Sequence, residues 1–365
     1  MKFSDLNINK KLIDVLGENK IETPTPIQSM SIPPILEGCD VIAQAKTGTG
    51  KTLAFLLPLF EKIDTNNNNV QALIITPTRE LAIQITKEAE KLSKAKDVNI
   101  LSCYGGKDIS AQLNKLKKNV HLVVATPGRL IDHIDRKSID LSNLKIFVLD
   151  EADMLLYIGF KNEIESIIKS IPKKKQMLCF SATIDSQVKK LMYRHMNDPQ
   201  IIVAAQKNIT NENIKHELVE TTDRKKLQAL VDVLNEDNPF LSIIFCRTKR
   251  RVDKLEAELS QRGFNCEKIH SDISQAKRER VMKNFRDLKY QYLIATDVAQ
   301  RGLDISGVDA VYNYDFPESC EDYIHRMGRT GRVGNDGYTC SFFVDKNWRS
   351  LEEIENKLGK KITRR

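Results

Sequence analysis

Residues 45–52 read Ala-Lys-Thr-Gly-Thr-Gly-Lys-Thr, and these residue types at this spacing suit the binding of a phosphate group. Gly48 and Gly50 allow the backbone to curl until successive N–H groups point at one anion. A short apolar run precedes the loop, and the helix-forming run 53–57 follows it. The N-terminus of a helix that begins near Gly50 would add its unpaired N–H groups and the positive end of its dipole.

Two side chains at the end of this loop suit the binding of a nucleoside triphosphate. Lys51 can reach the β- and γ-phosphates, and the Thr52 hydroxyl can bind Mg²⁺. The general pattern G-x-x-x-x-G-K-[ST] has glycine at the position of Ala45. The loop alone therefore leaves open a glycine-rich turn that binds no ligand.

A second feature is the acidic pair Asp150-Glu151, which directly follows the apolar run 146–149. In a nucleotide hydrolase, Asp150 would hold Mg²⁺ through water, and Glu151 would orient or deprotonate the attacking water. Acids after a strand also serve as helix N-terminal caps. The phosphate loop earlier in the chain favours the hydrolase interpretation.

The second half of the chain is rich in arginine. Four arginines precede Val203 and fifteen follow it, and the stretch 325–332 reads His-Arg-Met-Gly-Arg-Thr-Gly-Arg. Arg offers a planar fork for phosphate. Because this half has no phosphate loop, the expected anion is the nucleotide held by the first half. Arg329 and Arg332 would then act as arginine fingers.

The elements that must position these residues alternate between strands and helices. Apolar runs at 72–75, 121–125, 146–149 and 177–180 predict buried strands, and the patterns 79–92 and 111–116 predict helices. The alternation resumes after a polar stretch, with strands expected at 218–220, 243–246, 266–269, 292–295, 310–312 and 340–344. This order predicts an α/β fold with parallel sheets covered by helices. Ligands bind at the carboxyl ends of such strands.

At 365 residues the chain exceeds the usual size of one hydrophobic core. We therefore expect two domains, residues 1–203 and 214–365, joined by a linker at 204–213. Hydrophobic residues at 41% and charged residues at 29% are typical of an ordinary folded protein. The net charge of +8 permits polyanion binding without demonstrating it.

The cysteine pattern and the lengths of the apolar runs disfavour other classes of protein. The seven cysteines are scattered without a C-x-x-C pair, so neither a disulfide framework nor a zinc site is indicated. No apolar run approaches membrane-spanning length. We expect a reducing, cytoplasmic compartment.

The N-terminal segment carries one further candidate. Residues 3–16 have apolar residues at helical spacing, and Pro24 and Pro26 then predict a rigid, non-helical turn that includes Gln28. Gln28 can both donate and accept hydrogen bonds, which suits recognition of an adenine edge.

The ordered set of motifs resembles the DEAD-box ATP-dependent RNA helicases over nearly the whole chain. The motifs are Ala45–Thr52, Pro77–Leu81, Gly105-Gly106, Thr126–Arg129, Asp150-Glu151-Ala152-Asp153, Ser181-Ala182-Thr183, Ala295–Ala299, Arg301–Asp304 and His325–Arg332. The family's phosphate loop begins with Ala, which accounts for Ala45. Departures occur at Ile21, Ser271 and Gln300, and they concern rate and coupling rather than any catalytic group.

The resemblance implies two tandem recombinase-like domains that bind ATP, Mg²⁺ and single-stranded RNA. It implies that Phe3 stacks near adenine, that Thr23 assists Gln28, and that Asp304 lies at the ribose. Ser181 and Thr183 would couple to Asp153. The remaining nucleotide-binding positions are those of the loop itself: Ala45, Thr47, Gly48, Thr49, Gly50, Lys51 and Thr52.

The resemblance also implies contacts to the RNA backbone, which position RNA without reading its sequence. The implied residues are Thr78, Arg79, Gly106, Thr126, Gly128 and Arg129 in the first domain, and Thr248, Gln275, Arg278 and Thr296 in the second. A short RNA duplex is a further expected substrate. Ribosomal or RNA-degradation partners and a monomeric state are further expectations.

Two other functions remain to be weighed at this point. A DNA-directed translocase is disfavoured by Gln28 and the preceding Thr-Pro-Thr-Pro-Ile segment. An ATP-gated RNA clamp that scarcely turns over is disfavoured by Glu151, Arg329 and Arg332. The leading hypothesis is an RNA-stimulated ATPase that closes on single-stranded RNA and separates short duplexes locally and non-processively.

Overall fold

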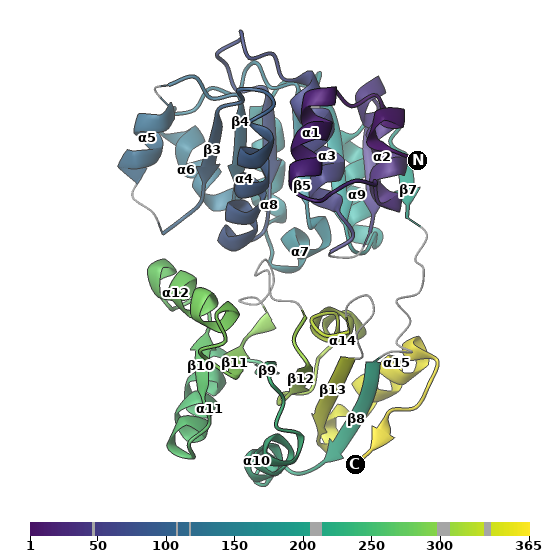
Figure 1. Ribbon diagram of the computed structural model, residues 1–365, viewed down its shortest axis with the longest axis vertical. Coiled ribbons are helices and arrows are strands. Elements are labelled where there is room, and N and C mark those ends of the chain that lie inside the picture. The colour runs from purple at the N-terminus through teal and green to yellow at the C-terminus, as the bar shows by residue number, and fades with distance from the viewer. Residues whose placement is uncertain (46–47, 107–108, 117, 205–213, 298–306, 332–336) are drawn as a thin grey trace. The chain divides into compact units, whose positions relative to one another are not determined.

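The computed structural model describes residues 1–45, 48–106, 109–116, 118–204, 214–297, 307–331 and 337–365. The chain divides into two compact units, Met1–Gln206 (unit 1) and Lys207–Arg365 (unit 2) (Figure 1). All but the first residue of the expected linker 204–213 lies outside the described residues.

Unit 1 is built on a parallel sheet with the strand order β3-β4-β2-β5-β6-β1-β7. Its strands are β1 (Val41–Gln44), β2 (Ala72–Ile75), β3 (Ile100–Cys103), β4 (Leu122–Ala125), β5 (Ile146–Asp150), β6 (Gln176–Ser181) and β7 (Gln200–Val203). Its helical segments are η1 (Phe3–Leu6), α1 (Lys10–Glu18), α2 (Pro26–Glu37), α3 (Lys51–Lys62), α4 (Arg79–Leu92), α5 (Ile109–Leu116), α6 (Pro127–Asp135), α7 (Ala152–Tyr157), α8 (Lys161–Ser170) and α9 (Ser186–His195).

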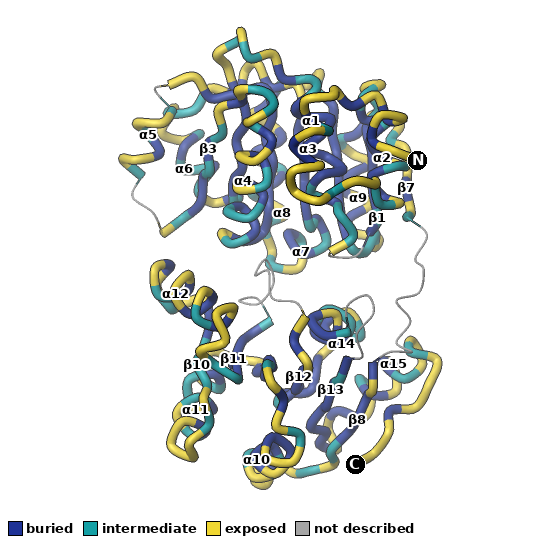
Figure 2. The backbone as a smooth tube through the Cα atoms, in the orientation of Figure 1, coloured by how far each residue is buried: buried dark blue, intermediate teal, exposed yellow. Residues whose placement is uncertain are grey.

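Alternate residues of the central strands feed two separate cores, as the two-residue period of a strand requires. In β2, Ala72 and Ile74 pack in the core beneath α1–α4, while Leu73 and Ile75 pack in the core beneath α6–α9. The central strands are buried on both faces, and the exposed residues gather on the outer helix surfaces and in loops (Figure 2). Burial on both faces explains why these strands read as continuous apolar runs.

Unit 2 repeats the design with the strand order β10-β11-β9-β12-β13-β8-β14, again parallel. Its strands are β8 (Ile214–Glu220), β9 (Ser242–Phe245), β10 (Cys266–Ile269), β11 (Tyr292–Ala295), β12 (Ala310–Asn313), β13 (Gly337–Phe343) and β14 (Thr363–Arg364). Its helical segments are α10 (Lys226–Asp237), α11 (Lys249–Gln261), α12 (Gln275–Arg286), α14 (Cys320–Met327), η3 (Asp345–Asn347) and α15 (Trp348–Leu358). Three cores lie against this sheet, beneath α10 and α11, beneath α12, and beneath α14 and α15.

The predicted parallel α/β fold is confirmed, with most strands within two residues of their expected bounds. The prediction of a non-helical turn through Pro26 was wrong. Helix α2 begins at Pro26, because the first helical position needs no backbone N–H and favours the fixed φ of proline. The helical pattern of 3–16 is also interrupted, since Asn7 has a φ of 58° and separates η1 from α1.

No helix in the described parts of either unit is long and apolar enough to cross a membrane.

Candidate functional site

The residues expected to bind nucleotide lie at the carboxyl ends of three neighbouring strands of unit 1. The phosphate loop follows β1, the Asp150–Asp153 cluster follows β5, and Ser181 closes β6. These strands are adjacent in the order β5-β6-β1. The sheet therefore collects residues that are more than a hundred positions apart in the sequence.

The phosphate loop is closed by contacts of its own side chains. Gly50 caps α3 with a φ of 93°, a left-handed conformation that favours glycine. Lys51 Nζ donates a 2.8 Å hydrogen bond to Ala45 O, and the Lys51 side chain is buried. Gly48 has a φ of 81°. Thr47 lies outside the described residues, whereas Thr49 and Thr52 are described at the turn and at the start of α3.

Gln28 connects α2 to this loop. Its Oε1 accepts from Thr25 N at 2.9 Å, and its Nε2 donates to Gly50 O at 3.0 Å. A Cβ atom at Gly50 would lie 2.5 Å from Gln28 Nε2, so only glycine allows this approach. In this conformation, the amide expected to recognise adenine is engaged with the loop itself.

The two residues expected to assist Gln28 differ in their placement. Thr23 is exposed just before α2. The ring of Phe3 is only 1% exposed and packs in the core beneath α1–α4. Stacking of this ring on adenine would require it to leave that core, so this structure gives Phe3 a packing position rather than an open stacking face.

Asp150 and Glu151 lie at the end of β5 in contrasting conformations. Burial raises the pKa of Asp150 to about 7, the nearby Lys51 charge lowers it, and Glu151 raises it further. Asp150 Oδ1 accepts from Glu151 N at 3.0 Å. Glu151 has a φ of 51°, an uncommon conformation for a residue other than glycine. Such conformations cluster at functional sites, where surrounding structure must hold them.

Asp153, Ser181 and Thr183 form one hydrogen-bonded cluster. Thr183 donates to Asp153 Oδ2 from both its backbone N and its Oγ1, each at 2.9 Å, and Asp153 N donates to Ser181 Oγ at 3.1 Å. Burial alone would raise the pKa of Asp153, but the hydrogen bonds with Ser181 and Thr183 and the Lys51 charge outweigh it, so its pKa is lowered. Asp153 is therefore held ionised by the residues of β6 and its following turn.

The donors present are compatible with Mg²⁺ that arrives with a nucleotide. The described residues contain no cluster of three or more His, Cys, Asp or Glu able to hold a metal on their own. Mg²⁺ usually binds through one or two carboxylates, phosphates of the substrate and water. One buried carboxylate, Asp150, and one hydroxyl, Thr52, beside a phosphate loop fit that requirement.

The residues of unit 1 expected to contact RNA occupy the other half of the same sheet edge. Thr78 and Arg79 follow β2, Gly106 follows β3, and Thr126, Gly128 and Arg129 follow β4. These strands are adjacent in the order β3-β4-β2. Arg79 lies against Gly105, where an added Cβ would be 3.2 Å from its Nη2. Gly106 has a φ of 86°, and Gly128 has open space at its Cβ position.

Unit 2 places its expected RNA residues on the corresponding strands. Thr248 follows β9 and accepts from Arg251 N through Oγ1 at 3.3 Å. Gln275 and Arg278 lie at the start of α12, after β10, and Thr296 follows β11. These three strands are adjacent in the order β10-β11-β9. Gln275 Nε2 donates to Glu279 Oε1 at 3.1 Å.

The arginines of α14 and the following turn divide into different roles. Arg326 is buried and donates two hydrogen bonds to the Asp297 carboxylate, at 2.6 and 2.7 Å. It is therefore a structural anchor that the sequence interpretation did not identify. Arg329 follows α14 and is 9% exposed. Arg332 and Asp304 lie outside the described residues.

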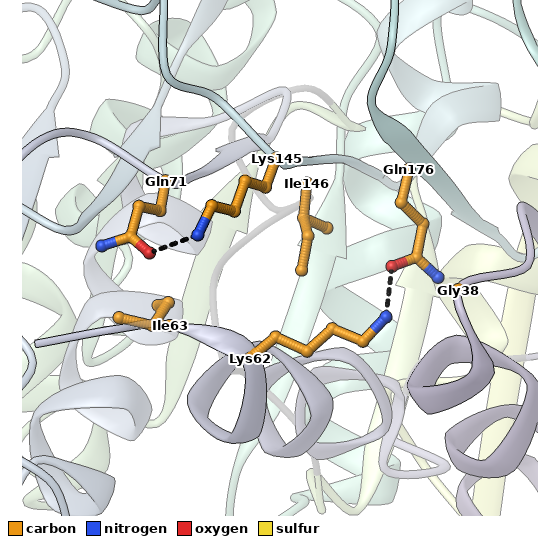
Figure 3. A pocket seen from close by; sticks show the side chains of 7 residues that line it. All are labelled: Gly38, Lys62, Ile63, Gln71, Lys145, Ile146 and Gln176. Atoms are coloured by element: carbon orange, nitrogen blue, oxygen red, sulfur yellow. Dashed lines mark hydrogen bonds between the residues drawn. The ribbon is translucent and has the colours of Figure 1, made fainter. Parts of the chain in front are cut away.

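A cavity of about 340 Å³ lies at the opposite edge of the unit 1 sheet, at the amino ends of the strands (Figure 3). Lys62 Nζ donates to Gln176 Oε1 at 3.0 Å, and Lys145 Nζ lies 3.4 Å from Gln71 Oε1. Gln176 Nε2 caps Ile35 O and Cys39 O at the end of α2. None of the predicted site residues lines this cavity.

Comparison with known proteins supports the same assignment. Residues 25–191 match the DEAD/DEAH box helicase family, and residues 225–334 match the helicase conserved C-terminal domain. The chain is 46% identical to the ATP-dependent RNA helicase CshA of Listeria monocytogenes, covering 99% of this chain and 69% of that protein. It is 45% identical to the DEAD-box ATP-dependent RNA helicase CshA of Bacillus subtilis, covering 99% of this chain and 73% of that protein.

Solved structures agree with the fold. S. cerevisiae Dbp5 bound to RNA and ADP BeF3 has 29% identity and a TM-score of 0.88, covering 100% of this chain and 95% of that chain. Mss116p bound to single-stranded RNA and AMP-PNP has 33% identity and a TM-score of 0.87, covering 98% and 77%. With two matched helicase domains, a confirmed fold and similarity to curated relatives over 99% of its length, this chain belongs to the family of DEAD-box ATP-dependent RNA helicases, enzymes that hydrolyse ATP.

Proposed function

We propose that this chain hydrolyses ATP in an RNA-stimulated cycle in which its two units close on single-stranded RNA and separate short duplexes locally and non-processively. The observation that carries the proposal is the shared sheet edge of unit 1. Nucleotide residues follow β5, β6 and β1, and RNA residues follow the adjoining β3, β4 and β2. One rigid sheet thus supports both sets of contacts, so the binding of one ligand can affect the other.

In this proposal, each catalytic residue has one task. Lys51 leaves the Ala45 carbonyl and neutralises the β- and γ-phosphates. Thr52 and Asp150 would hold Mg²⁺, which would supply positive charge against the developing phosphate charge. Asp150 must lose its proton to do so, because its pKa is raised to about 7 by burial. Glu151 orients or deprotonates the attacking water. Gln28, with Thr23, recognises adenine.

Unit 2 supplies the remaining groups. Arg329 and Arg332 stabilise the charge of the transition state, and such arginines contribute on the order of 10³–10⁵ in rate where they come from outside the phosphate site. RNA contacts on both units favour the closed state, so RNA raises turnover by bringing the arginines to the phosphate. The cluster of Asp153, Ser181 and Thr183 links the acidic strand end to β6 and couples hydrolysis to closure.

The solved structure of Mss116p bound to single-stranded RNA supports RNA as the polymer that this chain binds. Cytoplasmic location, a monomeric state, and partners from the ribosome or from RNA-degradation machinery are parts of the proposal that rest on family resemblance.

Steady-state ATP turnover with single-stranded RNA, single-stranded DNA of the same sequence, and no polymer tests the proposal. We expect RNA to stimulate ATP turnover strongly, and DNA not to stimulate it. Equal stimulation by DNA would instead support a DNA translocase, and RNA binding without turnover would support a clamp. Alanine substitution of Arg329 or Arg332 should lower the RNA-stimulated rate far more than ATP affinity.

A further inference from the structure

A buried glutamine on α5 joins the two loops of unit 1 that are expected to contact RNA. Gln112 is 5% exposed and is the one buried residue among the described residues of α5. Burial of an uncharged amide is costly unless its donors and acceptor are paired. A helix that packs through a glutamine rather than an apolar residue therefore suggests a role for its hydrogen bonds.

Each end of the Gln112 amide reaches a different loop. Its Nε2 donates to Tyr104 O at 3.2 Å, immediately before the Gly105-Gly106 turn that follows β3. Its Oε1 accepts from Arg129 Nη1 at 3.3 Å and from His133 Nε2 at 2.9 Å. Arg129 and His133 are both on α6, the helix that follows β4.

His133 fixes the orientation of this arrangement. Its ring is fully buried, and its Nδ1 lies 2.8 Å from the Oγ of Ser138, three residues beyond the end of α6. Because Gln112 Oε1 can only accept, His133 Nε2 must carry the proton. Burial, followed by the Arg129 charge, lowers the pKa of His133 and keeps the ring neutral. The ring thus holds the Gln112 oxygen in place opposite the Arg129 guanidinium.

We infer that Gln112 and His133 are positioning residues that keep the Gly106 turn and the Arg129 side chain in a common arrangement for the RNA backbone. The inference rests on the proposed RNA contacts of Gly106 and Arg129. A purely architectural role would need only an apolar side chain at position 112 to attach α5. The observed amide instead bonds to the backbone of one protein loop that is expected to contact RNA and to the charged side chain of the other.

The test is a double-mutant cycle in the full chain with Gln112→Met and Arg129→Ala. Methionine has nearly the volume of glutamine and fills the same site without the hydrogen bonds. We expect each single variant to raise the RNA concentration for half-maximal ATPase stimulation roughly 10-fold, the effect of losing one hydrogen bond to a charged group. For Gln112→Met, the maximal turnover rate should stay near that of the parent. The double variant should resemble Arg129→Ala alone, because Gln112 acts through Arg129.

A matched control is available at the other edge of the sheet. Gln176 is also buried, and its amide bonds to Ile35 O, Cys39 O and Lys62, away from the expected RNA contacts. Gln176→Met should therefore leave the RNA concentration dependence unchanged, even if it lowers the melting temperature. A melting curve and an ATP-affinity measurement on every variant distinguish a shift of the protein loops that contact RNA from a general loss of folding.

Different outcomes overturn different statements. If Arg129→Ala weakens RNA stimulation but Gln112→Met does not, the positioning inference is wrong and the proposed RNA contact stands. If the two effects add fully in the double variant, Gln112 acts independently of Arg129 and the inference is also wrong. If Arg129→Ala has no effect on RNA, the RNA contact in the proposed function is wrong. His133→Asn, which shortens the donor to Gln112, should weaken RNA stimulation in the same direction as Gln112→Met.

Discussion

Replacing Arg326 by methionine should destabilise unit 2 strongly while leaving ATP binding by unit 1 unchanged. Arg326 donates to both oxygens of Asp297, to Asn313 Oδ1 at 3.0 Å and to Asp315 O at 2.8 Å. The Arg326 and Asp297 side chains are 3% and 20% exposed. Methionine would remove the guanidinium, whose Cζ lies 5.0 Å from the centroid of the Phe245 ring, and it would leave the Asp297 carboxylate without its counter-charge.

The expected magnitude follows from that burial. Breaking a buried ion pair by removing one partner costs about 3–5 kcal/mol, because the remaining charge stays desolvated. For a unit of this size, 1 kcal/mol shifts the melting temperature by about 2–4 °C, so a decrease of about 6–20 °C is expected. Arg262→Met is the matched control in unit 2, since its pair with Glu258 on α11 is partly exposed. That pair should contribute little, because solvent screens exposed ion pairs.

The assay can follow unit 2 alone. The chain has one tryptophan, Trp348, which starts α15 and lies against Phe343 with ring centroids 6.2 Å apart. Its fluorescence during urea or thermal unfolding therefore reports unit 2. Asp297→Asn should also destabilise, and the double variant should cost less than the sum of the singles. An Arg326→Met transition no lower than that of Arg262→Met would refute the buried pair, and weakened ATP binding would instead indicate a phosphate contact.

Three further predictions concern catalysis and pH. Glu151→Gln should abolish turnover and retain ATP-dependent RNA binding, because it removes the carboxylate that activates water but no expected phosphate contact; turnover near the parent rate would contradict the assignment. Residues 1–203 expressed alone should bind ATP without appreciable hydrolysis, since Arg329 and Arg332 are missing; hydrolysis as fast as that of the whole chain with RNA would disprove the composite mechanism. Burial lowers the pKa of His121, whose Nδ1 accepts from Asn99 N, so the unfolded state takes up its proton first. The stability of unit 1, followed by circular dichroism in urea, should fall as the pH drops below about 6.5, by at most about 1.4 kcal/mol per pH unit from this group, and His121→Asn should reduce that slope.

The central strands could be predicted because their burial on both faces leaves continuous apolar runs, and the phosphate loop could be predicted because its chemistry is local. The edge strands β3, β7 and β14 were missed. Residues 200–203 of β7 read Gln-Ile-Ile-Val, a short apolar run that lies just before the polar stretch and is mostly exposed in the structure. The proline at position 26 was interpreted as a helix breaker because sequence alone does not show that it occupies the first helical turn.

Contacts between distant elements could not be predicted in the same way. The series Arg326, Arg329, Arg332 has regular spacing, which suggests one shared role, yet the partner of Arg326 is Asp297 on another loop. Gln112 carried no signal at all, because a lone glutamine on a polar helix has the pattern of a solvated residue. Its role depends on Tyr104 and Arg129, which the sheet order β3-β4 brings together.

The two units treat the acid at a strand end differently, and this difference gives a physical reason for the proposed division of labour. In unit 2, Asp297 follows β11 and is neutralised by a bidentate contact with Arg326. In unit 1, Asp150 at the end of β5 has the Lys51 charge nearby, and its pKa stays raised. A permanent arginine beside Asp150 would occupy the carboxylate that the proposed mechanism reserves for Mg²⁺. Supplying Arg329 and Arg332 from a second unit keeps that carboxylate available until RNA and ATP are both bound, so the separation of acid and arginine would itself make hydrolysis depend on RNA.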